Sequence, residues 1–172
     1  MKQKFLLLLT LVSIVLLQSC KKEMNPAQKS ASSATEMAKK KNAVPIKGSY
    51  TTFAEILQGP PMLRQRVTGL GSSSHLGKGS FVAIPTLNFT TPPPFSLSGT
   101  AVFTAANGDE FYTSFTGTAT PNGLGANIVV MTHSITGGTG RFTDASGTFI
   151  GNTVAAPGHA EGFITYEGTI DY

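Results

Sequence analysis

The chain has 172 residues, 40% of them hydrophobic and 13% charged, which suits one ordinary domain and excludes a disordered chain. Its 19 glycines and 10 prolines argue against a helical bundle, and a single cysteine excludes a disulfide framework or an all-cysteine zinc site. The formal charge of +4 is unevenly placed, since residues 1–42 carry a net +6 and residues 43–172 a net −2. A basic nucleic-acid-binding domain is therefore not indicated.

The first 20 residues have the layout of a bacterial secretion signal. Lys2 and Lys4 precede an apolar run over residues 5–17 that is too short to cross a bilayer as a helix. The following Leu17-Gln18-Ser19-Cys20 resembles the lipobox of bacterial lipoproteins, although Gln18 is an unusual residue there. The resemblance implies a signal peptide over 1–19, acylation of Cys20 and anchoring in a lipid bilayer of the cell envelope. The alternative is an ordinary secretion signal with an unmodified cysteine.

A basic segment follows the cysteine. Residues 21–42 contain six lysines and two glutamates among serines and alanines, with no continuous apolar stripe. We therefore expect residues 20–42 to form a flexible tether with a reach of roughly 25 Å. Because Lys21 stands where an acidic residue would retain an enteric lipoprotein in the inner membrane, the resemblance favours the outer membrane.

From residue 43 onward the hydrophobic period is two, which predicts a β domain over residues 43–172. Two alternating runs flank Asn107-Gly108, a strong hairpin signal in which both turn residues would take positive φ. Asp109 and Glu110 beside it are interpreted as turn residues, because two adjacent acids do not make a calcium loop. The predicted strands cover 47–58, 63–71, 75–87, 97–105, 111–117, 125–136, 146–154 and 160–171.

Eight short strands with glycine-marked connections predict an antiparallel up-and-down barrel, with a β-sandwich as the alternative. Pro92-Pro93-Pro94 belongs in a connection or at a rim. Residues 127–131 and 162–166 are apolar on both faces, so we expect those strands to be covered on both sides or to meet a partner surface.

A glycine-rich segment over residues 137–149 is the most specific motif. It resembles the GGTG-x-F-x-x-A-x-G signature of the allene oxide cyclase and dirigent-like barrels, where it links two strands. The residue types agree with a tight reversal in which Phe142 plugs the core and Gly147 allows close backbone approach. A phosphate-binding loop is excluded because the Lys-Ser/Thr ending is missing. The expected structural-turn residues are Gly137, Gly138, Gly140, Phe142 and Gly147.

The resemblance also implies an apolar cavity, since the plant relatives handle oxylipins or phenolic radicals. Ten phenylalanines and four tyrosines of residues 43–172 would line such a cavity or fill it. For a domain this small, filling is the expectation.

Few polar residues are candidates for binding or chemistry. His159 and Glu161 are two apart and would share one face of a strand as an acid/base pair. His75 is expected to hydrogen-bond backbone at a barrel end, and Arg64 and Arg66 would hold a carboxylate only if they point inward. His133 is a further polar residue without an assigned role. The ligand-binding candidates are Glu55, Arg64, His75, His159 and Glu161.

No metal site, cofactor motif or nucleophile triad is predicted. The leading hypothesis is a non-enzymatic envelope lipoprotein that binds a small hydrophobic ligand or an envelope partner through its barrel. One alternative is a cofactor-free cyclase or isomerase acting on a lipid-derived substrate. The other alternative is a purely structural or interaction module. The sequence does not define an oligomeric state.

Overall fold

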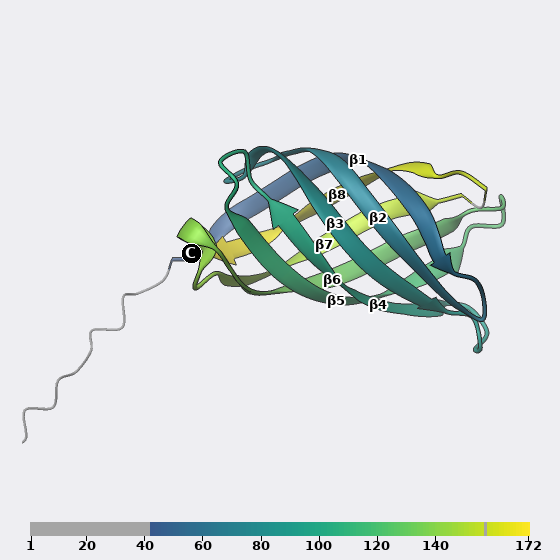
Figure 1. Ribbon diagram of the computed structural model, residues 1–172. Coiled ribbons are helices and arrows are strands. Elements are labelled where there is room, and N and C mark those ends of the chain that lie inside the picture. Colours follow the sequence, from purple (N-terminus) through teal and green to yellow (C-terminus); the bar gives the residue numbers. More distant parts are fainter. Residues whose placement is uncertain (1–41, 157) are drawn as a thin grey trace, which may run out of the picture. The chain divides into compact units, whose positions relative to one another are not determined.

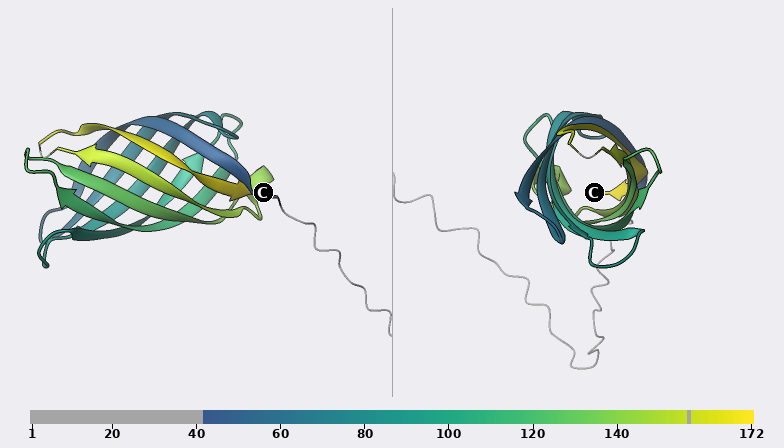
Figure 2. Two further views of the ribbon diagram at one scale, coloured as in Figure 1. Left: turned by 180° about the vertical axis from the view of Figure 1, so that it is seen from behind. Right: turned by 90° about the vertical axis from the view of Figure 1, so that its right-hand side faces the viewer.

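The computed structural model describes residues 42–156 and 158–172, and these form a barrel of eight strands with one short 3₁₀ helix. Each strand pairs antiparallel with the next along the chain, and the last pairs with the first, so the sheet is closed (Figures 1 and 2). The predicted all-β, eight-stranded up-and-down barrel is confirmed. The elements are β1 (Val44–Gln58), β2 (Met62–Ser73), β3 (Gly77–Asn88), β4 (Phe95–Thr104), β5 (Glu110–Pro121), β6 (Asn127–Gly138), η1 (Gly140–Phe142), β7 (Ser146–Ala155) and β8 (Glu161–Asp171).

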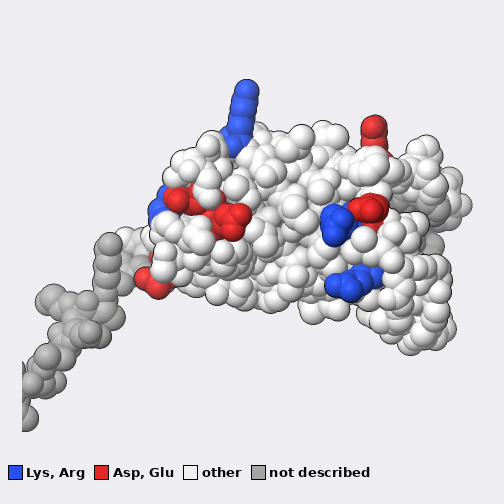
Figure 3. All heavy atoms as spheres, viewed as in Figure 1, with Lys and Arg blue, Asp and Glu red and all other residues white. Residues whose placement is uncertain are grey.

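Side chains alternate between the inside and the outside of the wall, as the period of two requires. Inward positions carry the buried apolar residues, whereas Ser and Thr recur at outward positions and charged groups are sparse on the face drawn in Figure 3. Ile128, Val130 and Phe163 point outward and are 50%, 39% and 56% exposed. No second layer covers these strands within the described residues, so the predicted covering on both faces is wrong; a partner surface there stays a prediction.

The two ends of the barrel differ. We call the end with the β1–β2, β3–β4, β5–β6 and β7–β8 connections the mouth end; Pro92-Pro93-Pro94 lies in the β3–β4 connection there, as predicted. The other end, the closed end, holds the remaining three connections (Figure 2). Val44 pairs with Ile170 at the closed end, so the chain enters and leaves the barrel opposite the mouth.

The glycine-rich segment links β6 to β7 at the closed end and forms the predicted plug. Gly137 and Gly140 have φ of 123° and 53°, which other residues rarely adopt. Phe142, in η1, is fully buried, with its ring centroid 5.7 Å from that of Phe111. A side chain on Gly138 would meet Phe142, and one on Gly147 would meet the Thr169 carbonyl. The segment is thus a structural turn.

The β4–β5 connection corrects the predicted hairpin geometry. Pairing ends at Thr104 and Glu110, which leaves a five-residue loop in which Gly108 has φ of 87° and Asn107 does not have a positive φ. Asn107 acts through its side chain instead, because its Oδ1 accepts from the Asp109 amide (3.2 Å) and its Nδ2 donates to the Asp109 carboxylate (2.8 Å). Asp109 also lies 3.7 Å from Arg141 Nε and so joins this loop to η1.

Candidate ligand-binding cavity

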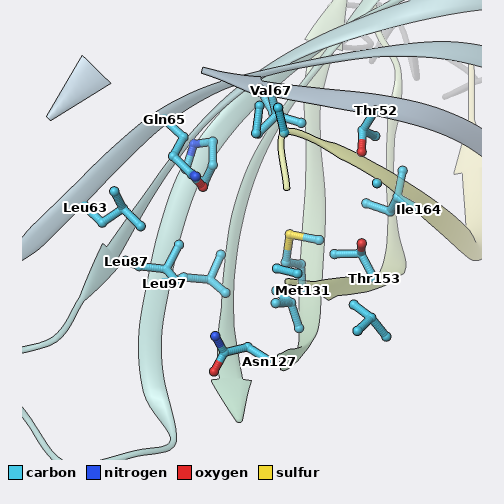
Figure 4. A pocket seen from close by; sticks show the side chains of 18 of the residues that line it. Thr52, Leu63, Gln65, Val67, Leu87, Leu97, Asn127, Met131, Thr153 and Ile164 are labelled. Carbon is cyan, nitrogen blue, oxygen red and sulfur yellow. The ribbon is translucent and has the colours of Figure 1, made fainter. Parts of the chain in front are cut away.

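A cavity of about 570 Å³ occupies the half of the barrel nearest the mouth (Figure 4). Most of its wall is aliphatic or aromatic. Figure 4 shows Leu63, Val67, Leu87, Leu97, Met131 and Ile164 lining this space. The predicted complete filling of the interior is therefore wrong.

The cavity exists because large and small inward residues are segregated along the barrel. Around the cavity the inward positions of three adjacent strands hold Ala54, Val67 and Ala83, which are paired side by side. Towards the closed end the inward residues are aromatic, and their rings pack at centroid distances of 4.7 Å for Phe103 and Phe111 and 5.6 Å for Phe103 and Phe149. The aromatic residues fill the closed half and leave the mouth half hollow.

The floor of the cavity combines aromatic rings with two polar groups. We define it as the lining residue nearest the closed end on each of β3, β4, β5, β6 and β8, namely Phe81, Phe103, Phe115, His133 and Tyr166. Tyr166 stacks on Tyr50 at 5.6 Å, and both hydroxyl oxygens are buried. Burial raises the pKa of both tyrosines, so both phenols are neutral at physiological pH.

His133, on β6, is the other polar group of the floor and is only 4% exposed. Its Nδ1 lies 3.1 Å from Oγ1 of Thr113 on β5, a residue that is 2% exposed. The imidazole stacks on Phe149 with a centroid distance of 4.5 Å and lies 4.7 Å from Phe115. Burial among these rings lowers the pKa of His133 from 6.5 to about 4, so the side chain is neutral at pH 7.

Glu55 and Arg64 do not reach the cavity, so their proposed role as inward ligand-binding residues is wrong. Inward positions are even-numbered on β1 and odd-numbered on β2, which places both side chains on the outer face. Glu55 pairs in register with Arg66, and their side chains form an exposed ion pair of 3.2 Å. Such a pair contributes at most about 1 kcal/mol to stability.

His75 lies in the β2–β3 turn at the closed end, away from the cavity. It has a φ of 69°, and its Nε2 is 2.9 Å from the Pro45 carbonyl oxygen, which is the expected backbone contact at a barrel end. Its Nδ1 is 3.1 Å from the Tyr172 hydroxyl, and its own carbonyl accepts from Arg141 at 2.6 Å. Through these contacts His75 connects the first and last strands' ends at the closed end of the barrel. His75 does not line the cavity.

His159 and Glu161 both border the cavity at its mouth, but not as the predicted pair on one strand. His159 precedes β8 and lies in the β7–β8 connection, so strand alternation does not orient it relative to Glu161. Both are exposed. Across the described ranges, no group of three His, Cys, Asp or Glu side chains is placed to hold a metal ion.

The cavity wall carries no positive side chain. Lys47, Arg64, Arg66, Lys78 and Arg141, all described, lie elsewhere, and Glu161 at the mouth is the acidic residue that borders the space. The ligand-binding residues predicted from the sequence do not include His133. Its inward orientation follows from the alternation of Val129, Met131 and Ile135 around it, a signal that the sequence does contain.

Comparisons with protein-family models, curated proteins and solved structures find no match to the chain. Among the described residues, no helix has the length and apolar character needed to cross a membrane. Cys20 and the predicted signal peptide and tether lie outside the described residues.

Proposed function

We propose that this protein binds a small hydrophobic molecule in its barrel while a lipid on Cys20 anchors it in the cell envelope. The observation that carries the binding proposal is the apolar cavity of about 570 Å³ that opens at one end of the barrel. Its volume falls within the range of roughly 300–1,000 Å³ that is usual for small-molecule sites. Burying an apolar ligand surface there is favourable by about 25 cal/mol per Å².

The binding proposal is tested by narrowing the cavity. Ala54 and Ala83 flank Val67 on the wall, so Ala54→Leu with Ala83→Leu places two larger side chains into the space. We expect the neutral fluorescent probe N-phenyl-1-naphthylamine to bind the unaltered protein saturably and the double variant at least about tenfold more weakly, because the lost volume removes apolar contact.

The matched control is Val82→Leu, which enlarges an outward side chain that is 43% exposed and leaves the cavity unchanged. Native mass spectrometry of the delipidated protein after exposure to a lipid extract gives a second readout. Equal probe binding by both variants, or no retained lipid, would contradict cavity binding and favour a purely structural or interaction module.

The alternative of a cofactor-free cyclase or isomerase is favoured by one observation, the imidazole of His133 in the cavity floor. A histidine that contacts a bound substrate is a common proton donor or acceptor. The resemblance of residues 137–149 to the allene oxide cyclase and dirigent-like barrels supports the same alternative. Chromatography of the retained lipid distinguishes the two functions, because a binding protein returns it unchanged.

The anchor proposal rests on the lipobox-like Leu17-Gln18-Ser19-Cys20, on Cys20 being the only cysteine of the chain and on the polar segment that follows. Several acyl chains would hold the protein stably, at about 0.8 kcal/mol per buried CH₂. Cells that express the Cys20→Ala variant should fail to incorporate labelled fatty acid into the protein. Labelling that persists in this variant would rule out the anchor, and with it the assignment to the outer membrane.

A further inference from the structure

His133 is a polar residue of the cavity floor with one ring nitrogen that the described part of the chain leaves unused. Of the two imidazole nitrogens of His133, Nδ1 is engaged by Thr113 Oγ1 at 3.1 Å. Nε2 has no hydrogen-bond partner in the described part of the chain. A neutral imidazole has one donor and one acceptor nitrogen, so Nε2 is left with one hydrogen bond to make.

The surroundings of Nε2 leave space for a ligand atom. A methyl group placed on Gly151, on β7, would lie 3.5 Å from Nε2 and 3.4–3.5 Å from the ends of the Met131 and Ile164 side chains. Met131 and Ile164 line the cavity. Because residue 151 is glycine, β7 places no side chain in the space beside Nε2.

The charge of the site restricts what this atom can hold. No Lys or Arg of the described residues lines the cavity, and burial keeps the His133 pKa at about 4, so the imidazole is uncharged at pH 7. A carboxylate or ammonium group at this depth would be buried without a partner, at a cost of several kcal/mol. A hydroxyl or carbonyl oxygen loses only its water contacts and recovers one hydrogen bond.

We propose that His133 is the polar anchor of the cavity and that the ligand is a neutral, largely hydrocarbon molecule that enters head first with a hydroxyl or carbonyl oxygen. This inference rests on the proposed binding function and specifies its ligand class. Thr113 holds the imidazole, Gly151 leaves room beside Nε2, and the apolar wall contacts the hydrocarbon part.

The test uses ligands that differ only in their head group. Dodecan-1-ol, dodecan-2-one, dodecane and dodecanoate compete with N-phenyl-1-naphthylamine at pH 7, on the unaltered protein and on the double variant His133→Phe/Thr113→Val. The phenyl ring keeps the stacking partner of Phe149, and replacing both hydrogen-bonding residues avoids an unpaired hydroxyl. We expect the double variant to bind the alcohol about 3- to 10-fold more weakly, because a hydroxyl pairs with Nε2 in either tautomer, and dodecane unchanged; a matching loss for the ketone would show that Nε2 carries the proton.

A second variant keeps the inference testable if the double variant does not fold. Gly151→Ala adds a methyl group at ordinary contact distance from Nε2 and should also weaken the alcohol selectively. The control Val82→Leu enlarges an outward side chain that does not line the cavity and should leave all four affinities unchanged.

The outcomes separate the two proposals. If none of the four ligands displaces the probe, the proposed binding function fails. If all bind but the double variant weakens alcohol and alkane equally, the binding function stands and the anchor is wrong. Tightest binding of dodecanoate to the unaltered protein would overturn the argument that the site selects neutral heads.

Discussion

The imidazole of His133 is a titratable group that the barrel keeps uncharged. Its pKa is about 4 in the folded protein against 6.5 as the ordinary value. Between these values the unfolded chain binds a proton that the folded barrel does not, so this contribution to stability is complete above pH 6.5 and is lost as the pH falls towards 4. We expect it to lower the free energy of unfolding by on the order of 3 kcal/mol between pH 7 and pH 4, measured by urea denaturation.

Two variants test the origin of this pH dependence. His133→Phe/Thr113→Val removes the buried imidazole and should lose the corresponding part of the slope. His159→Gln removes an exposed histidine instead and should keep it. If all three proteins show the same slope between pH 4 and 7, another group causes it.

For single residues, the sequence predicts whether a side chain points into the barrel better than it predicts which side chains it contacts. Alternation on β6 places His133 inside the barrel, but only the closed sheet places Thr113, 20 positions earlier, at its Nδ1. Glu55 was misplaced because residues 53–57 are apolar on both faces of β1, so the pattern near the mouth does not distinguish inside from outside.

At the scale of elements, local patterns predicted most of the strands. A strand predicted over 146–154 is found as β7, Ser146–Ala155, because alternation and glycine-rich turns are properties of neighbouring residues. His159 was expected near the start of a strand, yet β8 begins at Glu161, where pairing with Phe53 of β1 begins. Strand ends depend on the partner strand, which a local pattern does not contain.

The plug at the closed end carries a prediction about stability. Phe142 is fully buried, and its ring lies against Phe111 and Tyr172 at 5.7 and 5.0 Å. Phe142→Ala should lower the free energy of unfolding by about 3–5 kcal/mol, because it removes apolar contact and leaves a void in the closed half. Guanidinium denaturation measures the loss.

The control for this prediction is the same truncation on the outer face. Phe163→Ala removes a ring that is 56% exposed and should cost less than half as much. Equal losses in the two variants would mean that the glycine-rich segment does not act as a plug.

At the scale of the whole molecule, the hollow interior could not be predicted from composition. The phenylalanines and tyrosines of residues 43–172 are numerous enough to fill a small barrel. Whether these aromatic side chains fill the interior depends on their positions along the barrel axis. Ala54 and Ala83 lie beside the cavity while Phe111 and Phe149 lie towards the closed end, and this depends on the register of strands distant in sequence.

The uneven distribution of charge predicts that the basic segment, residues 21–42, binds anionic lipid surfaces. Residues 21–42 carry six lysines and two glutamates, whereas residues 43–172 carry five basic and seven acidic side chains. A lysine near an anionic lipid surface contributes about 1 kcal/mol to binding, and salt screens this attraction beyond about 8 Å at physiological ionic strength. The chain from residue 20 onward, with Cys20→Ser to prevent lipidation, should therefore sediment with vesicles containing phosphatidylglycerol at low salt and be released at high salt.

Replacing the six lysines of residues 21–42 by glutamine should abolish this binding, whereas Lys47→Gln with Lys78→Gln on the barrel should leave most of it, because the barrel retains a net negative charge either way. Binding that survives the six replacements and resists salt would have a different cause. Exposed apolar side chains of the barrel, such as Phe163, would then make the membrane contact. The prediction that the basic segment attracts the chain to the membrane would be wrong.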